Sequence, residues 1–265
     1  MLRLILLPIL FLLPAIPALA ATINVDSNCT LAQAVISAGN DSAPADSGCE
    51  DGDNDDTIQL SYYVRITATL PIVSSGDKIT IDGGGYTVRG GGSGSDFRML
   101  SVPSDVSVVL QNITIADFHV SASGNDSGGA IIVNGGIENN TVVIRNAVFR
   151  DNSATGRDPV GGAIWFSGGV DSILIEDSFF IDNHTIGSGG AIFLESSATI
   201  NNTAFIGNSA QNGGAIHVNN DVELTLTNSS FINNEVPESN GTGGALRFFN
   251  NSGSTVESTL THVTF

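Results

Sequence analysis

Apolar and polar residues recur in one fixed order through most of the chain. Six-residue segments begin with an aliphatic residue, carry a polar residue two places later and end in an apolar residue, which is Phe in five of the six: 110–115, 144–149, 175–180, 200–205, 226–231 and 260–265. Short runs rich in Ile, Val, Thr and Phe, separated by Gly, Asn, Ser and Asp, are typical of strands and turns. No helical spacing runs through this region. The pattern therefore predicts a series of short strands.

A second segment lies between these strands. Gly-Gly-Ala followed by an aliphatic residue occurs at 128–131, 161–164, 189–192, 213–216 and 243–246, and the repeat length varies between 25 and 34 residues. A propeller blade needs four antiparallel strands and about 40–50 residues, which is longer than this repeat. A parallel solenoid coil needs only a few short strands and tolerates loops of different length at its corners. The fold class predicted is all-β, a parallel β-helix.

Stacking explains why the repeat has this chemistry. Successive coils lie about 4.8 Å apart, so that equivalent side chains sit directly above one another. We expect an internal column of stacked rings from Phe149, Phe180, Phe205 and Phe231. We also expect side-chain amides to form a ladder at the turns, each donating to the next, from Asn112, Asn146, Asn202 and Asn228. Another Asn recurs three residues after Phe, at 152, 183, 208 and 234. The paired glycines permit a bend with unusual backbone angles.

The N-terminal region has a different composition. Residues 1–20 hold one Arg, an apolar run and a small-residue pattern ending at Ala20, which predicts a cleaved signal peptide. The alternative is a membrane anchor, which the prolines at 8, 14 and 17 disfavour. We predict an N-terminal cap over 21–56 and the β-helix over 57–265. Because the sequence stops at Phe265, inside a sixth repeat, we expect it to be truncated at its C-terminal end.

A helix is predicted inside the cap, over residues 30–38. Thr30 and Gln33 form a capping-box pattern, and Gly39 is expected to end the helix. The two cysteines, Cys29 and Cys49, are predicted to pair in an oxidising compartment. Free thiols or metal ligands are the alternatives, but no third or fourth Cys or His ligand lies nearby. The helix would then cover the open end of the first coil.

Charge excludes several partners. The chain has a formal net charge of −18, and removing residues 1–20 takes away Arg3 and no acidic residue, leaving 8 basic against 27 acidic residues. Such a surface repels nucleic acid and anionic lipid. No later apolar run reaches the roughly 20 residues that a membrane span needs. We therefore expect an exported protein with no transmembrane span after signal cleavage and no nucleic-acid partner.

Two parts of the sequence resemble known families. Residues 29–38, with Cys29, Leu31 and Ala34, and the later ITIDGGG resemble the CSLREA-type N-terminal domain of bacterial exported β-helix proteins, although Ala32 and Gln33 replace its Arg-Glu. The GGAI and FxxN repeats over 128–265 resemble the chlamydial polymorphic outer membrane protein repeats and, more widely, the pectin-lyase-like superfamily. The resemblance implies a right-handed parallel β-helix, surface display, and adhesion or a passenger role.

Pectin-lyase-like folds include polysaccharide lyases and glycosidases. A polygalacturonase-like site would show Asn-Thr-Asp, Gly-His-Gly and Arg-Ile-Lys motifs, and a lyase needs a base and cations beside the uronate carboxyl. None of these motifs is present, and one Lys and seven Arg follow residue 20. The four histidines lie in unrelated contexts, which predicts ladder or solvent-facing roles. We predict no catalytic residues and no required cofactor.

One candidate metal site emerges from the register. Asp117, Asp151 and Asp182 occupy the position before the FxxN asparagine on consecutive repeats. Carboxylates about 4.8 Å apart either raise their pKa values or share a cation, and Ca²⁺ suits them. Two alternatives stay open: a solvated turn column, or a carboxylate pair of a retaining glycosidase. The acidic loop over 51–56 departs from the calcium-loop pattern, since it lacks the required Gly and Glu.

These observations predict an exported, non-catalytic β-helix rod, secreted or attached at the cell surface or outer membrane, with an adhesin-like or passenger role. An extracellular polysaccharide or a host or cell-surface ligand is the expected partner. The competing hypothesis is a carbohydrate-active enzyme, either a polysaccharide lyase or a glycoside hydrolase. The absence of a basic cleft favours the first hypothesis.

Overall fold

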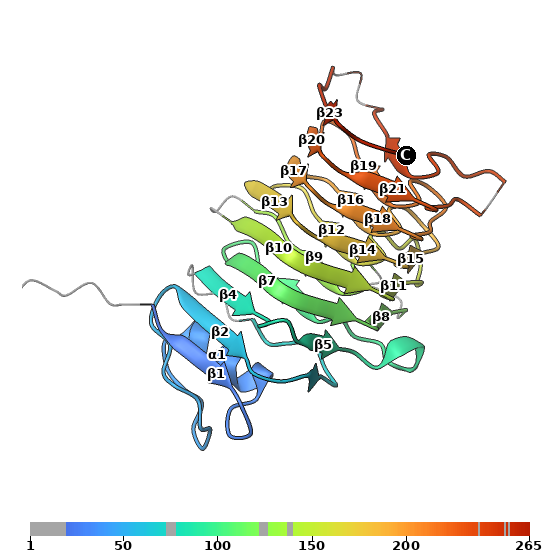
Figure 1. The fold of residues 1–265 in the computed structure, drawn as a ribbon. Helices are drawn as coiled ribbons and strands as arrows, with labels where there is room; N and C mark the ends of the chain where they lie inside the picture. The colour runs from blue at the N-terminus through green and yellow to red at the C-terminus, as the bar shows by residue number, and fades with distance from the viewer. Residues whose placement is uncertain are drawn as a thin grey trace, which may run out of the picture.

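The chain is wound into a stack of flat coils. The computed structural model describes residues 20–72, 78–121, 127–136, 140–237, 239–251, 253 and 255–265, so that most of the predicted signal peptide lies outside the described residues. The predicted fold class is confirmed: the molecule is a parallel β-solenoid of about six turns with one short helix near the N-terminus. Figure 1 shows the coils rising in order from β1 to β23, with α1 at the N-terminal end.

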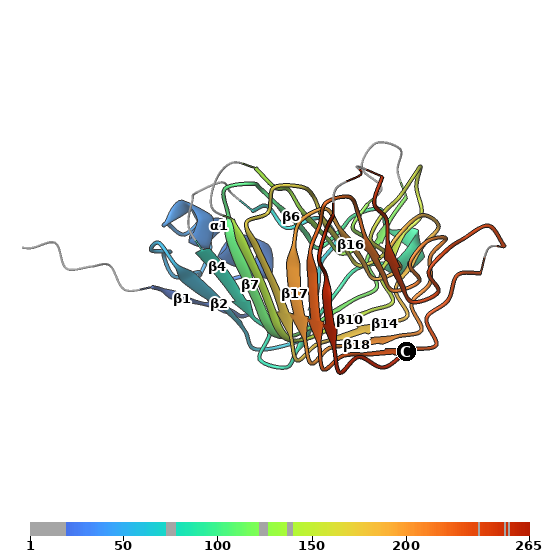
Figure 2. The same cartoon turned by 90° about the horizontal axis from the view of Figure 1, so that it is seen from above.

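The largest sheet has fourteen strands in two arms. The first arm runs in the order β1 (Thr22–Val25), β2 (Asp56–Leu60), β4 (Lys78–Asp82), β7 (Ser107–Ala116), β10 (Thr141–Arg150), β13 (Ser172–Glu176), β17 (Ala198–Asn201), β20 (Leu224–Thr227) and β23 (Thr259–Thr261). The second arm contains β3 (Val64–Arg65), β5 (Thr87–Arg89), the ends of β7 and β10, β14 (Phe179–Ile181), β18 (Ala204–Ile206) and β21 (Ser230–Ile232). Figure 2 shows the two arms meeting at a corner.

Two smaller sheets complete the coils. The six-stranded sheet contains β6 (Leu100–Val102), β9 (Ile131–Val133), β12 (Ile164–Phe166), β16 (Ile192–Leu194), β19 (Ile216–Val218) and β22 (Leu246–Phe248). The three-stranded sheet contains β8 (His119–Val120), β11 (Ser153–Ala154) and β15 (His184–Thr185), and a 3₁₀ turn spans Gly92–Gly94. All pairs between these strands are parallel, and an isolated antiparallel bridge joins Phe97 to His119 of β8.

Each coil turns its corners with residues in the left-handed backbone region. The corner between the two arms has φ of 46–53° at Asn112, Asn146, Asp177, Asn202, Asn228 and His262. The corner after the second arm has φ of 52–65° at Asp117, Asp151, Asp182, Gly207 and Asn233. Asn and Asp tolerate this conformation because their short polar side chains can bond the local backbone, and Gly tolerates it because it lacks Cβ. The polar columns of the sequence are therefore corner columns.

The paired glycines form the third corner, and glycine is required at the two positions for different reasons. The first glycine of each pair has φ between 62° and 73°. The second does not need that conformation, but a Cβ on Gly162 or Gly190 would lie 2.0 Å from a carbonyl oxygen of the next coil. Only a residue without a side chain permits this close approach of neighbouring coils. The alanine that follows is fully buried in four of the repeats, at 130, 163, 191 and 215.

Phenylalanine rings form a continuous stack inside the coils. The ring centroids of Phe149 and Phe180 lie 4.9 Å apart, with the planes 4° from parallel. The stack continues from Phe180 to Phe205 at 5.1 Å, then to Phe231 at 4.9 Å and to Phe265 at 5.0 Å. Phe149, Phe180 and Phe205 are fully buried. Burying one such ring contributes roughly 1.5–3 kcal/mol, so that this column forms a large part of the core.

The helix α1 spans Leu31–Asn40 and packs against β1, β2 and β4. The capping box of Thr30 and Gln33 is present. The helix does not end at Gly39, as the sequence suggested; it continues to Asn40, and Asp41 takes the left-handed conformation that ends it. Asp can replace Gly there because it tolerates the left-handed region. The sheet also begins at Thr22, inside the segment predicted as the cap, because β1 pairs in register with β2.

Candidate functional site

A column of large side chains covers the outer face of the six-stranded sheet. The strands pair so that the middle residues of β9, β12, β16, β19 and β22 lie in register: Ile132, Trp165, Phe193, His217 and Arg247. In β9, β12, β16 and β19 the residues on either side of the middle residue are buried in the core, whereas in β22 Leu246 is partly buried and Phe248 is 46% exposed. The strand period of two places alternate residues on opposite faces, and a bulky residue in the middle of each strand therefore builds an outer column.

Trp165 is held in place by a hydrogen-bond network that crosses three coils. Its indole Nε1–H donates to Glu195 Oε2 at 3.1 Å, and the side-chain amide of Asn219 donates to Glu195 Oε1 at 3.1 Å. Glu195 and Asn219 follow β16 and β19 by one position and thus stand beside the outer column. Both carboxylate oxygens of Glu195 are occupied within the protein, which fixes the orientation of the indole ring.

A broad polar groove opens beside this network. Its volume is about 530 Å³, and it is lined by Gly136, Gly169, Val170, Asp171, Glu195, Ser196, Ser197, Asn220, Asp221 and Val222. Asp171 is tied to its neighbour, since its Oδ2 accepts the backbone N–H of Asn140 at 2.8 Å. The lining includes three carboxylates and no Lys, Arg or His. The groove is therefore suited to a ligand that donates hydrogen bonds or carries positive charge, and it is unsuited to uronates or phosphates.

The groove is open to solvent, and its lining is mostly polar. Ligand pockets typically enclose about 300–1,000 Å³ and combine aromatic walls with a few fixed polar groups. The residues that line this groove include no aromatic side chain: Trp165 is connected to it only by the hydrogen bond to Glu195, and Phe249 lines the second cavity. The sequence had not pointed to this groove, because its polar residues differ from coil to coil. The one available signal was Trp165, the single tryptophan of the chain.

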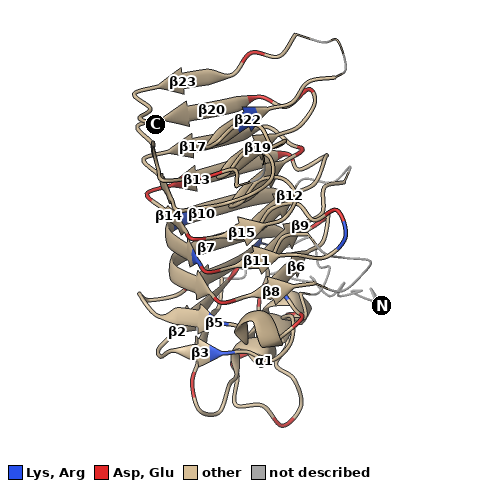
Figure 3. Ribbon diagram, turned by 90° about the vertical axis from the view of Figure 1, so that its right-hand side faces the viewer, with Lys and Arg blue, Asp and Glu red and all other residues tan. Residues whose placement is uncertain are grey.

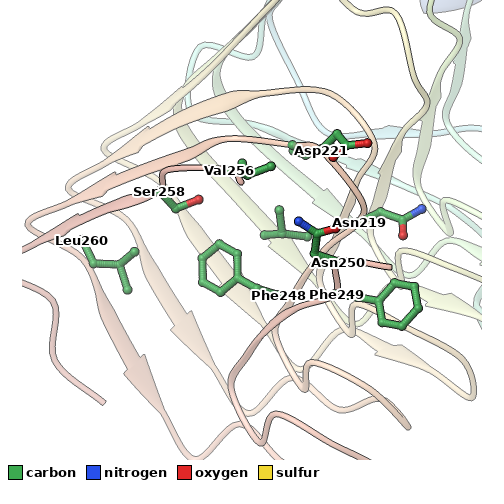
Figure 4. Close-up of a pocket in the computed structure, with 10 residues that line it drawn as sticks. Asn219, Asp221, Phe248, Phe249, Asn250, Val256, Ser258 and Leu260 are labelled. Carbon is green, nitrogen blue, oxygen red and sulfur yellow. The ribbon is translucent and has the colours of Figure 1, made fainter. Parts of the chain in front are cut away.

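A second cavity lies within the coils near β22 and β23. It has a volume of about 220 Å³, and Figure 4 shows the residues that line it, among them Asp221, Phe248, Asn250, Val256 and Leu260. Its lining is mostly apolar, since it continues the core between the sheets. Phe248 and Leu260 are half-exposed there. This cavity belongs to the packing of the last coil and presents no fixed polar constellation.

The three aspartates predicted as a calcium site do lie in register at one corner. Asp117 Oδ2 is 2.8 Å from Nε of Arg89, and Asp151 Oδ2 is 2.8 Å from Nη1 of Arg150. Asp182 is exposed, and its carboxylate sits over Gly207 of the next coil. Within the described part of the chain, no group of three or more His, Cys, Asp or Glu is arranged to hold a metal ion. Calcium binding by this column stays a prediction, with two of its carboxylates already paired to arginine.

The acidic loop before β2 has a structural role for one of its carboxylates. Asp56 is fully buried and its Oδ1 accepts the backbone N–H groups of Ala21 and Asp53, each at 3.0 Å. Burial raises the pKa of Asp56. Its carboxylate closes the loop onto the start of β1.

The predicted amide ladder at the corner between the arms is interrupted. Asn146 donates from its side chain to Asn112 Oδ1 at 2.9 Å, and Asn202 donates to Asp177. The amide of Asn228 instead reaches Asn201, at 3.3 Å. These side chains are partly exposed. The column is chiefly a set of corner residues with positive φ, joined by separate hydrogen bonds.

A continuous amide ladder lies inside the coils, one residue after the aspartate corner. The amide of Asn152 donates to Asn183 Oδ1 at 3.0 Å, and that of Asn183 donates to Asn208 Oδ1 at 3.0 Å. Asn208 continues the ladder to Asn234 at 2.9 Å. Each amide also donates to a backbone carbonyl, for example that of Phe149 at 3.0 Å. The sequence shows that these residues recur, but the ladder it predicts is the one at Asn112, Asn146, Asn202 and Asn228.

The four histidines lie in three different environments. His119 Nδ1 lies 2.7 Å from Ser153 Oγ and His184 Nδ1 lies 2.8 Å from Ser209 Oγ, so both are ladder pairs between coils. Burial lowers the pKa of His184. His262 is exposed at a corner with positive φ. His217 differs, because it is 3% exposed on the outer column.

Cys29 and Cys49 form a disulfide, which ties the start of α1 to the loop that follows it. Cys29 is fully buried within the core cluster that also contains Leu31 and Val35. Closing a loop of this length stabilises a small domain by roughly 2–4 kcal/mol. The bridge therefore holds the helix over the first coils.

The fold defines the class of this protein, a parallel β-solenoid, and an open polar groove lies at the corner that follows the six-stranded sheet. Residues 202–219 match the Chlamydia polymorphic membrane protein repeat. In the structure this stretch runs from the corner before β18 through the Gly-Gly corner to the end of β19. No curated protein and no solved structure gives a significant match. In the described residues, no helix has the length and apolar character needed to cross a membrane.

Proposed function

We propose that this protein is an exported, surface-displayed β-solenoid with a non-catalytic, adhesin-like or passenger role. The observation that carries the proposal is the match of residues 202–219 to the polymorphic membrane protein repeat, which occupies one coil of a stacked parallel solenoid. The strongly acidic composition supports it, because 8 basic against 27 acidic residues after residue 20 keep an extended rod soluble and separate from other copies. Figure 3 shows acidic residues along many turns and few basic ones.

The ligand of this rod is proposed to be an extracellular polysaccharide or a cell-surface molecule held in the groove of Asp171, Glu195 and Asp221. Hydroxyl groups of such a ligand are hydrogen-bond donors, and the groove offers carboxylate, serine and amide acceptors. Because the lining carries no cationic side chain, neutral or amine-bearing ligands are favoured over acidic ones.

Binding of the purified protein to intact cells and to immobilised polysaccharides tests the proposal. Replacing Glu195 by Gln removes the charge that orients Trp165, and we expect it to weaken ligand binding several-fold. Glu223→Gln is the matched control, since Glu223 is exposed on the coil above and is not among the groove residues. Equal binding by the two variants and the parent protein would exclude the groove, while protection of the protein from protease on intact cells would contradict surface display.

A carbohydrate-active enzyme is the second candidate, and the three groove carboxylates are the observation that favours it. Paired carboxylates are the groups that glycoside hydrolysis requires. Reducing ends and unsaturated uronate absorbance, measured on several polysaccharides with added Ca²⁺, separate the two functions. Turnover that disappears in an Asp171→Asn variant would reverse the proposal.

A further inference from the structure

His217 lies buried on the outer column of the six-stranded sheet, between two coils. Its backbone is in register with Phe193 of β16 on one side and Arg247 of β22 on the other. The imidazole stacks on the Phe193 ring, with centroids 4.8 Å apart and planes 18° from parallel. The ring of Phe249 lies 6.2 Å away. Aromatic groups and the neighbouring strands thus enclose a titratable side chain.

The surroundings of His217 favour its neutral form. The residue is 3% exposed, and among the described residues its Nδ1 has no hydrogen-bond partner. A protonated imidazole would carry an N–H at this atom, and an unpaired buried donor is costly. The buried position of the His217 side chain is therefore favourable only while the imidazole is uncharged.

The charged groups around His217 do not stabilise an imidazolium, because the nearest one on the facing strand is a cation. Arg247 faces it from β22, and the guanidinium Cζ of Arg247 rests 4.9 Å from the centroid of the Phe249 ring. On the β16 coil the charged group is Glu195, whose two oxygens are already bonded to Trp165 and Asn219. On its own coil the next charged side chains are Asp221 and Glu223, beyond the end of β19. Burial, together with the charge of Arg247, lowers the pKa of His217 to about 4.

We propose that the contact between β19 and β22 is an acid-responsive latch, in which protonation of His217 expels Arg247 and Phe249 and opens this part of the coil stack. The inference rests on burial, register and like charge, and it is independent of the proposed ligand groove. The proton goes to an imidazole nitrogen, which places a second positive charge beside Arg247 at a buried position. Opening relieves both costs, since it hydrates the imidazolium and separates the two cations.

The direction of the pH dependence follows from linkage. In the closed form His217 has a pKa of about 4, and in an open, hydrated form it returns to its ordinary value of about 6.5. Between these two values the open form binds the proton first, so the closed form loses stability as pH falls from about 6.5 towards 4. Between pH 7 and pH 4.5 the open population rises by roughly fiftyfold.

Hydrogen–deuterium exchange of residues 243–250 tests the latch in the whole protein. After correction for the intrinsic exchange rate, we expect the opening equilibrium of this segment to rise by tens of fold between pH 7 and pH 4.5. In a His217→Phe variant, which keeps a ring beside Phe193 and Phe249, the rise should vanish. His262→Asn is the control, since it removes an exposed histidine and places Asn at a corner where Asn already occurs in other coils.

A second measurement keeps the proposal testable if the phenylalanine variant misfolds. Arg247→Gln removes the like charge, so we expect the NMR-detected pKa of His217 to rise and the acid-induced exchange to shrink, with the segment still protected at pH 7. A directly measured His217 pKa at or above 6 in the parent protein would overturn the latch. An acid response of residues 243–250 that is unchanged in His217→Phe would overturn it as well.

Discussion

The side-chain oxygen of Asn183 accepts two hydrogen bonds from Asn152 on the preceding coil, one from its backbone N–H at 3.2 Å and one from its amide at 3.0 Å. The side-chain oxygen of Asn208 likewise accepts the backbone N–H and the side-chain amide of Asn183, each at 3.0 Å. Each asparagine thus satisfies a buried backbone donor and a buried side-chain donor of its neighbour. The ladder joins the coils at a corner where the strands leave the backbone unpaired.

Replacing Asn183 by Ala should destabilise the protein by about 3 kcal/mol, because Asn152 loses two hydrogen bonds, one from its backbone N–H and one from its amide, and the carbonyl of Phe149 loses one. Asn228→Asp is the control, since Asn228 is exposed, has positive φ and makes one long amide bond. We expect that change to cost less than about 1 kcal/mol. Urea unfolding at pH 7 measures the free energy of unfolding of both variants. Equal decreases in the two variants would show that the inner ladder does not stabilise the protein more than the exposed corner residues do.

Adjacent phenylalanines offer a test of the stacked core. Phe180 is fully buried between Phe149 and Phe205, whereas Phe179 is 46% exposed on the outer face. We predict a loss of about 3–5 kcal/mol for Phe180→Ala and under about 1 kcal/mol for Phe179→Ala. Chemical denaturation measures the free energy of unfolding of the two variants. A larger decrease for Phe179→Ala would contradict the stacked core, because it would show that Phe179 and not Phe180 is the buried residue.

The close approach of coils at the second glycine predicts an unusual sensitivity to one methyl group. In Gly190→Ala the new Cβ would meet the carbonyl oxygen of Gly214 at 2.0 Å, so we expect a loss of about 3 kcal/mol or a failure to fold. Gly244 holds the same position in the last repeat with nothing within 4 Å. Gly244→Ala should change stability by no more than about 1 kcal/mol. Thermal melts of both variants make the comparison.

We predict that the aspartate corner binds calcium weakly, because arginine side chains compete with the cation for its carboxylates. Because Arg89 and Arg150 already contact Asp117 and Asp151, we expect a dissociation constant on the order of 10⁻³ M. Arg150→Gln should tighten binding, and Asp151→Ala should abolish it. Calorimetric titration with CaCl₂ gives the three isotherms. An Asp151→Ala isotherm identical to that of the parent protein would remove the metal hypothesis and leave a solvated corner.

For the helix at the N-terminus, the neighbouring residues in the sequence are sufficient to predict where it begins but not where it ends. The capping box of Thr30 and Gln33 could be predicted because it lies within four consecutive residues. The end of the helix could not, because Gly39 is accommodated inside α1 and Asp41 turns the chain instead. Glycine lowers helix stability by only about 1 kcal/mol, which packing against β1 and β2 offsets.

The sequence by itself determined the coil and its register. Every coil needs the same residue type at the same place, so Phe, Asn and Gly-Gly recur, and the parallel stack with its phenylalanine column follows from that recurrence. Tertiary structure alone decided which asparagine column lies inside, since that depends on which way the side chain points at a left-handed corner. It alone assembled Trp165, Glu195 and Asn219, because equivalent positions on neighbouring coils carry different residues there. A periodic sequence reveals only what the coils share, whereas this hydrogen-bond network is built from the residues in which they differ.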